Sequence, residues 1–151
     1  MNFVLWPVAK WVPLALCWVL QSAWAATPVA TPLPPVELYA PNPCPTCAAW
    51  TQQLRQRGFV VTHEEKSPDS MRRIKHWVNV PSAHEAVQTA RIAGYFIEGS
   101  VPVEDILRLL KEKPMARGLG VSALPGGVAG HENFNTIMVG ADGLVSVYAR
   151  H

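Results

Sequence analysis

Residues 36–50 read Val36-Glu-Leu-Tyr-Ala-Pro-Asn-Pro-Cys44-Pro-Thr-Cys47-Ala-Ala-Trp50. The apolar run at 36–40 predicts a buried strand, and the prolines after it predict a turn. This turn delivers Cys44 and Cys47 into the first turn of a helix, where free backbone N–H groups and the positive end of the helix dipole favour a thiolate. We therefore expect Cys44 to be the sulfur of low pKa and Cys47, one turn later, to be its partner.

The Cys-x-x-Cys spacing leaves three interpretations open. It suits a redox pair that alternates between dithiol and disulfide, and it suits two soft ligands for one thiophilic metal ion. The third interpretation is a structural disulfide or two inert buried thiols. A disulfide that closes so short a loop adds little stability through chain entropy, so a disulfide at this position points to function.

The first 25 residues are predicted to be a secretory signal peptide. Lys10 supplies positive charge, an apolar run follows at 11–20, and the chain then reads Ser22-Ala-Trp-Ala25, the small-x-small pattern that precedes a cleavage site. Pro13 interrupts the apolar run, which is shorter than the roughly 20 residues a membrane-spanning helix needs. We expect cleavage after Ala25, no membrane attachment afterwards, and an oxidising compartment in which a disulfide persists.

The mature chain is predicted to be a proline-rich leader at 26–35 followed by a single domain at 36–151. Cys17 leaves with the signal peptide, so Cys44 and Cys47 are the cysteines of the mature protein. The whole chain carries 13 Lys and Arg against 11 Asp and Glu. This near balance lacks the basic stripe of a nucleic-acid-binding protein, so no nucleic-acid partner is expected.

The apolar patterns predict an α/β fold of thioredoxin-like type, in the order strand-helix-strand-helix-strand-strand-helix. The predicted elements are strand 36–40, a helix from residue 43 or 44 to 57, strand 59–62, a helix from 67 to about 78, the hairpin 86–93 and 95–98, and a helix from 102 to 113. In such a fold the third strand lies beside the first. The segment 83–87 should therefore pass near Cys44.

An extra C-terminal loop and hairpin are predicted after this core. Residues 115–135 are rich in glycine and are expected to form a long loop that folds back across the dithiol. A second hairpin is predicted from residues 136–139 and 144–148 around a turn at 141–143. Of the single residues that stand out, Trp50 is expected in the core. Glu98 is expected at a solvated hairpin position, with a pair to a neighbouring base as the less favoured alternative.

From here the chain resembles a known family, the CopG-like periplasmic proteins of domain of unknown function 411. The resemblance rests on the Cys-x-x-Cys segment 43–50 with Gly58–Val61, on Val80-Pro81 and Thr89-Ala90, on the segment 94–106, and on 117–119 and 142–148. The most specific part reads Gly94-Tyr-Phe-Ile-Glu-Gly-Ser-Val-Pro-Val-Glu-Asp-Ile106. The resemblance implies a thioredoxin-like fold, a periplasmic location, and an association with copper resistance.

The sequence departs from the family at its expected metal ligands. The family usually has a Cys-x-Cys-Cys cluster, and Thr46 occupies the middle position here. A later Cys-His pair of the family corresponds to Val87 and Gln88, and a family His corresponds to Ser100. Family loop methionines fall near Leu124 and His131 in a loose alignment. Soft sulfur ligands select Cu(I), so each replacement by Thr, Val, Gln or Ser removes a ligand.

With the resemblance, copper handling is the favoured hypothesis. Cys44 and Cys47 would hold a Cu(I) ion, with His131 as a third ligand, and the partners would be copper and other periplasmic metal-resistance proteins. The alternative is a thiol–disulfide oxidoreductase in which Cys44 attacks a substrate disulfide and Cys47 resolves the mixed intermediate. A further alternative is a degenerate family member whose disulfide is purely structural.

Overall fold

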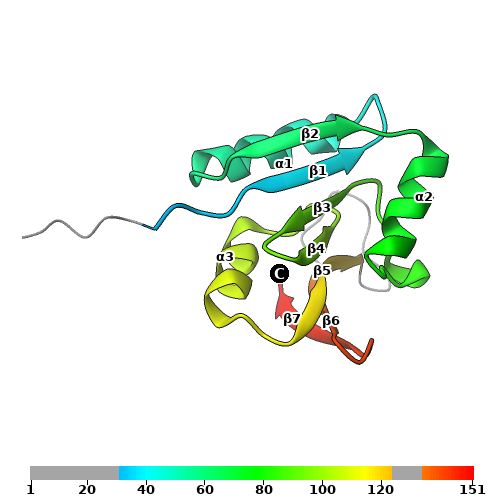
Figure 1. Ribbon diagram of the computed structural model, residues 1–151. Helices are drawn as coiled ribbons and strands as arrows, with labels where there is room; N and C mark the ends of the chain where they lie inside the picture. The colour runs from blue at the N-terminus through cyan, green and yellow to red at the C-terminus, as the bar shows by residue number, and fades with distance from the viewer. Residues whose placement is uncertain (1–30, 124–133) are drawn as a thin grey trace, which may run out of the picture. The chain divides into compact units, whose positions relative to one another are not determined.

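A mixed α/β fold is seen in the computed structural model, which describes residues 31–123 and 134–151 (Figure 1). Its elements are β1 (Val36–Ala40), α1 (Pro45–Gln56), β2 (Val61–Glu65), α2 (Pro68–Trp77), the short 3-10 helix η1 (Ser82–His84), β3 (Thr89–Ile92), β4 (Tyr95–Glu98), α3 (Val103–Glu112), β5 (Ala116–Ala123), β6 (Phe134–Gly140) and β7 (Val145–Arg150). The strands form one seven-stranded sheet in the order β2-β1-β3-β4-β5-β6-β7. The elements predicted between residues 36 and 113 are therefore found in the predicted order, with ends that differ by up to three residues.

The pairing of the strands places the start of α1 beside the start of β3. β1 and β2 are parallel and are joined through α1, whereas β3 is antiparallel to β1, with Leu38 opposite Ala90. β3 and β4 form an antiparallel hairpin. The prediction that the third strand lies beside the first is confirmed. This arrangement brings the chain that enters β3 to the end of β1 from which the Cys44 turn departs.

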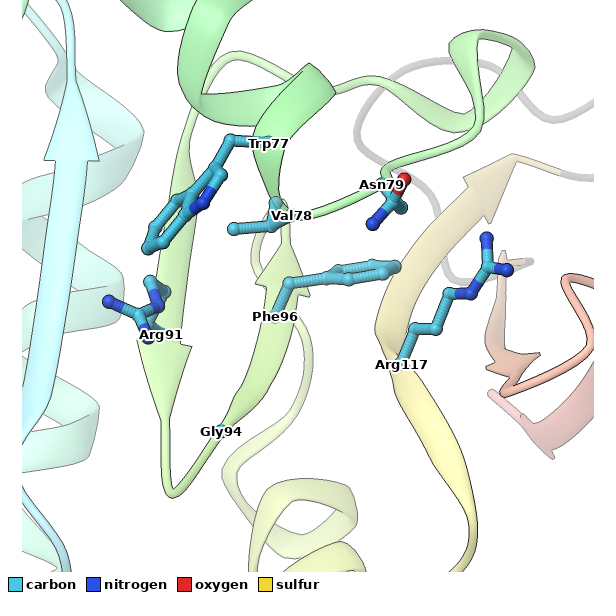
Figure 2. Close-up of a pocket in the computed structure, with 7 residues that line it drawn as sticks. All are labelled: Trp77, Val78, Asn79, Arg91, Gly94, Phe96 and Arg117. Atoms are coloured by element: carbon cyan, nitrogen blue, oxygen red, sulfur yellow. The ribbon is translucent and has the colours of Figure 1, made fainter.

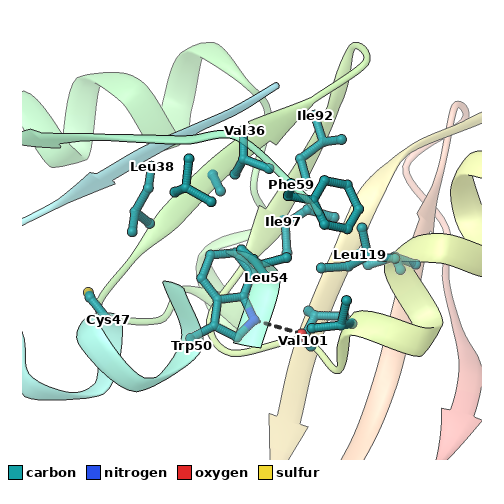
Figure 3. Close-up of a cluster of buried hydrophobic side chains, with 14 of the residues drawn as sticks. Val36, Leu38, Cys47, Trp50, Leu54, Phe59, Ile92, Ile97, Val101 and Leu119 are labelled. Carbon is teal, nitrogen blue, oxygen red and sulfur yellow. Dashed lines mark hydrogen bonds between the residues drawn. The ribbon is translucent and has the colours of Figure 1, made fainter. Parts of the chain in front are cut away.

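The main core joins α1 and α3 to the strands β1, β3 and β4. Cys47, Trp50 and Leu54 recur on one side of α1 and are buried, as their spacing predicts (Figure 3). The Trp50 indole Nε1 donates a hydrogen bond of 2.8 Å to the carbonyl of Val101, just before α3. This bond satisfies the indole N–H inside an apolar core and ties the helix that carries the cysteines to the loop that carries Ser100.

Residues 115–135 are not one long loop, because residues 116–123 form strand β5. The glycines that predicted a loop allow close packing instead. Gly118 lies directly against the backbone carbonyl of Phe96 on β4, where a side chain would collide, and β5 pairs in parallel with β4 at this point. Glycine within a strand often marks such a close approach of two backbones. The predicted second hairpin is confirmed by β6 and β7.

Several predictions concern residues that lie outside the described ranges. These are the signal peptide, the first half of the proline-rich leader (residues 26–30), and the segment 124–133 with His131. Within residues 31–123 and 134–151, none of the helices combines the length and apolar character that crossing a bilayer requires.

Candidate dithiol site

The two cysteines lie where β1 passes into α1, as the sequence predicts. Cys44 immediately precedes the helix, with Pro45 in its first position, and Cys47 lies within the first turn. The backbone N–H of Cys47 donates to the carbonyl of Cys44 at 3.2 Å. The two Cα atoms are 5.4 Å apart and the sulfurs are joined in a disulfide. Both sulfurs therefore occupy the positive end of the α1 dipole, where a thiolate released by reduction is stabilised.

The two sulfurs differ in their exposure to solvent. Cys47 is 2% exposed and belongs to the hydrophobic core, whereas Cys44 is partly exposed and packs at the edge of that core. Figure 3 shows Cys47 at the end of the core cluster, on the same helix as Trp50. A dissolved thiol or metal ion therefore reaches Cys44 first, and Cys47 is the protected partner.

A buried amide reaches Cys44 from the chain that enters β3. Gln88 is 2% exposed, and its Oε1 lies 3.9 Å from Cys44 Sγ. Its Nε2 donates to the hydroxyl of Ser100 at 3.4 Å. The sequence placed segment 83–87 near Cys44, and the contact is made one residue further along, by Gln88.

Three of the positions that resemble family ligand positions come together around Cys44. Thr46 Oγ1 lies 3.7 Å from Cys44 Sγ, and Gln88 and Ser100 complete the group described above. Val87 is 59% exposed and belongs to the solvent-facing surface. The groups around Cys44 are neutral hydroxyls and an amide, which bind Cu(I) poorly compared with thiolates. The soft ligands here are the two cysteine sulfurs, and in the described part of the chain no three His, Cys, Asp or Glu residues cluster as metal ligands.

A hollow of about 290 Å³ opens beside the disulfide, between α1 and β2. It is lined by Cys44, Cys47, Ala48, Thr51, Arg55 and His63. Arg55 is held in place by a hydrogen bond of 3.2 Å from its Nη2 to the carbonyl of Val61. The sequence analysis did not assign Arg55 or His63 to the site. The spacing of the sequence could have identified both residues. Arg55 follows Cys47 and Thr51 on the same side of the helix, and His63 lies on the side of β2 on which Val61 is buried.

A buried ion pair fixes the segment that carries Gln88. Glu98 on β4 is fully buried, so its predicted solvated position is wrong, and it pairs with the buried Lys75 of α2. The Lys75 ammonium donates to the carbonyl of Ala86 at 2.9 Å, and the Ala86 N–H donates to Glu98 Oε1 at 2.6 Å. Thr89 completes the network, since its hydroxyl donates to Glu98 Oε2 at 2.7 Å and accepts from Lys75. The network therefore fixes the chain on both sides of Gln88, at Ala86 and at Thr89.

Burial raises the pKa of the Glu98 carboxyl above its ordinary value of 4.5. The Lys75 ammonium counters part of this rise in pKa by hydrogen bond and by charge, and the donors Ala86 and Thr89 counter more of it. A buried carboxylate is costly unless such partners surround it. The stability of this network is therefore sensitive to the loss of either charged partner.

A second hollow, of about 340 Å³, is lined by Trp77, Val78, Asn79, Arg91, Gly94, Phe96 and Arg117 (Figure 2). The Arg91 guanidinium stacks on the Trp77 ring, 4.6 Å from its centre. Figure 2 shows Arg117 on the far side of Phe96 from this pair. Among the described residues, neither Cys44 nor Cys47 lines this hollow. The cysteines instead open into the hollow between α1 and β2.

The likeness to known proteins agrees with this geometry. Residues 82–131 match the family described as "Protein of unknown function, DUF411". Two solved structures entitled "Copper resistance protein copG", Form 1 and Form 2, superpose with TM-scores of 0.69 and 0.68 at 26% and 28% sequence identity. They cover 79% and 80% of this chain, which in turn covers 98% and 99% of theirs. No curated protein sequence matches the chain significantly. The chain therefore matches the DUF411 family model over residues 82–131, and its fold is similar to that of the two copper resistance protein structures.

Proposed function

We propose that this chain is an exported, periplasmic protein of copper resistance in which reduced Cys44 and Cys47 together hold one Cu(I) ion. The observation that carries the proposal is the pair of sulfurs at the start of α1, close enough to be bonded and with Cys44 open to solvent. Two thiolates are the donor set that Cu(I) prefers. The likeness to structures entitled copper resistance protein supports copper as the metal.

The proposed fold type is thioredoxin-like, with an added C-terminal β-hairpin. The support is the order of the elements, in which β1 and β2 are parallel across α1 and are followed by the antiparallel β3–β4 hairpin and α3. The neutral groups Thr46, Gln88 and Ser100 around Cys44 favour a single ion over a multi-copper thiolate cluster. Other periplasmic metal-resistance proteins are the proposed partners, and His131 stays a predicted third ligand.

Anaerobic titration of the reduced protein with Cu(I), in competition with a chelator, tests the proposal. The wild type is expected to bind one Cu(I) per chain. Cys44→Ser and Cys47→Ser are each expected to weaken binding by more than about 100-fold, since the loss of outer partners alone costs 10–100-fold in metal sites. Val87→Ala, at an exposed position in the same neighbourhood, is the control and should bind as the wild type does. Uptake that is unchanged in both cysteine variants would exclude a copper site at these sulfurs.

A second candidate function is thiol–disulfide exchange, and the unequal burial of the two sulfurs favours it. An accessible Cys44 with a protected Cys47 is the arrangement expected of an attacking and a resolving thiol. In that case the reduced protein should reduce the disulfides of insulin, and Cys47→Ser should accumulate a mixed disulfide through Cys44. Turbidity of reduced insulin and mass analysis of the trapped species are the measurements. A reduced wild type that leaves insulin intact removes this candidate.

A further inference from the structure

We propose that the hollow between α1 and β2 binds a low-molecular-weight thiol that carries a carboxylate, and that this thiol opens the Cys44–Cys47 disulfide. The step must precede Cu(I) binding as proposed above, because a disulfide offers no thiolate ligands. The proposal itself needs no copper, so its test is independent of the copper titration. It rests on four features of the hollow: its charge, its size, its neighbours and the exposure of the two sulfurs.

The charge of the hollow comes from Arg55. Of the described residues that line it, Arg55 carries a permanent positive charge, and His63 adds an imidazole that can donate a hydrogen bond to an anion. None of the described residues that line the hollow carries a carboxylate. The hydrogen bond to the carbonyl of Val61 employs Nη2 and holds the guanidinium at the wall. A guanidinium has five N–H donors in a fixed fork, so it can keep this bond and still receive a carboxylate.

The acidic residues that follow His63 in β2 have partners of their own. Glu65 follows His63 on the same side of β2, and its Oε1 accepts a hydrogen bond of 2.8 Å from Asn42 Nδ2. Glu64 pairs with Lys66 at 2.6 Å. These contacts reduce the competition that either carboxylate offers for Arg55. The hollow therefore presents a net positive wall to an incoming ligand.

The size of the hollow favours a small thiol over a protein substrate. Its volume of about 290 Å³ is close to the roughly 300 Å³ at which the range for small-molecule sites begins. Cys44 and Cys47 line one part and Arg55 another, two helical turns further along α1. A ligand that spans the hollow thus places its carboxylate and its sulfur at opposite ends. This separation matches a short thiol with an acidic tail.

The exposure of the sulfurs assigns their roles in the exchange. The thiolate of the ligand attacks the accessible Cys44 Sγ, which forms a new S–S bond and breaks the Cys44–Cys47 bond. The electron pair leaves on Cys47, which takes up a proton from water. A second thiol then attacks the ligand sulfur of the mixed disulfide and releases Cys44 as a thiolate. Two thiols become one disulfide, and they supply the two electrons that reduce the protein.

The test compares three thiols of different charge on the oxidised full-length domain. Mercaptopropionate is the anionic probe, mercaptoethanol the neutral one and cysteamine the cationic one. The rate of disulfide opening is followed by alkylation and mass analysis, and each rate is corrected for the thiolate fraction of the probe. The anionic-to-neutral ratio is expected to fall roughly 10- to 100-fold in Arg55→Gln, which is the range for loss of one hydrogen bond to a charged group. The cationic-to-neutral ratio should rise.

The same helix offers a matched control. Arg57 is exposed, pairs with Glu104 and does not line the hollow, so Arg57→Gln should leave both ratios unchanged. Arg55→Lys keeps the charge and should retain most of the anion preference. The neutral thiol measures any general increase in access to the disulfide. A variant whose disulfide opens faster with all three thiols therefore leaves the ratios unchanged and does not mimic the expected result. Equal ratios in wild type and Arg55→Gln, or an equal change in Arg57→Gln, would overturn the proposal.

Discussion

Replacing Lys75 by methionine is expected to lower the free energy of unfolding by about 3–5 kcal/mol, because it leaves the Glu98 carboxylate buried without its cation. Glu98 is fully buried and Lys75 is 5% exposed, so water cannot substitute for the missing ammonium. The carbonyl of Ala86 and the hydroxyl of Thr89 also lose a donor. Urea denaturation at neutral pH, monitored by circular dichroism, measures the loss.

Two variants separate this charge effect from a simple loss of packing. In the double variant Lys75→Met with Glu98→Gln, the buried charge is gone, while the amide oxygen still accepts from the Ala86 N–H and the amide nitrogen can donate to the Thr89 hydroxyl, so much of the lost stability should return. Arg72→Met removes the cation of an exposed ion pair with Asp69 on the same helix. It should cost less than about 1 kcal/mol. A double variant no more stable than Lys75→Met alone would contradict the assignment.

The cost of Lys75→Met should also depend on pH. Removal of the ammonium takes away contributions that lower the pKa of Glu98, so this pKa rises further above 4.5 in the folded variant. A group whose folded pKa is raised contributes stability that is fully present below its unfolded pKa and is lost as pH rises through the folded value. The difference between wild type and variant should therefore be smallest below about pH 4 and should widen toward neutral pH.

The same network explains what the sequence could not predict about the site. Helical and strand periodicities are local, so they predicted α1, the placement of Cys44 and Cys47, and the burial of Trp50. Burial of Lys75 and Glu98 depends on a contact between α2 and β4 that the local pattern does not contain. Each residue read by itself is typical of a solvated surface. Paired across the fold they become the anchor for the segment of Gln88.

The candidate site shows the same division between local and long-range information. The Cys-x-x-Cys spacing and its place before a helix were sufficient to predict that Cys44 and Cys47 lie together at the start of α1, whereas the state of the pair (dithiol, disulfide or metal-bound thiolates) stayed open. Arg55 and His63 lie beside the cysteine pair because α1 packs against β2. The sequence alone did not predict which residues of α1 and β2 would face each other. The resemblance to the DUF411 family indicated which positions correspond to the family's ligands. In the structure Thr46 and Gln88 contact Cys44, and Ser100 contacts Gln88. The fold thus brings these positions together, but the residues that occupy them in this chain have no soft donor atoms for Cu(I).

Replacing Gly118 by alanine is expected to destabilise the protein by about 1–3 kcal/mol, although only one methyl group is added. A Cβ at this position would overlap the carbonyl oxygen of Phe96 and approach the Phe96 Cγ to 2.6 Å. The oxygen belongs to the backbone of β4, which is held between β3 and β5 and cannot rotate away. The strands must therefore separate or shift in register, and urea denaturation measures the cost.

Gly120 on the same strand provides the matched control for Gly118. Its added Cβ would lie 3.6 Å from the nearest atoms, Glu98 Cβ and Ile137 Cγ1, which is an ordinary van der Waals distance. In a strand alanine is intrinsically favoured over glycine, and Gly120→Ala gains this preference just as Gly118→Ala does, but without the collision. Its stability should therefore stay within about 1 kcal/mol of the wild type. If both alanine variants lose the same stability, the cause is the glycine content of β5 and not the contact with Phe96. If only Gly118→Ala loses stability, then β5 needs glycine at position 118 in order to pair with β4, whereas it does not need glycine at position 120.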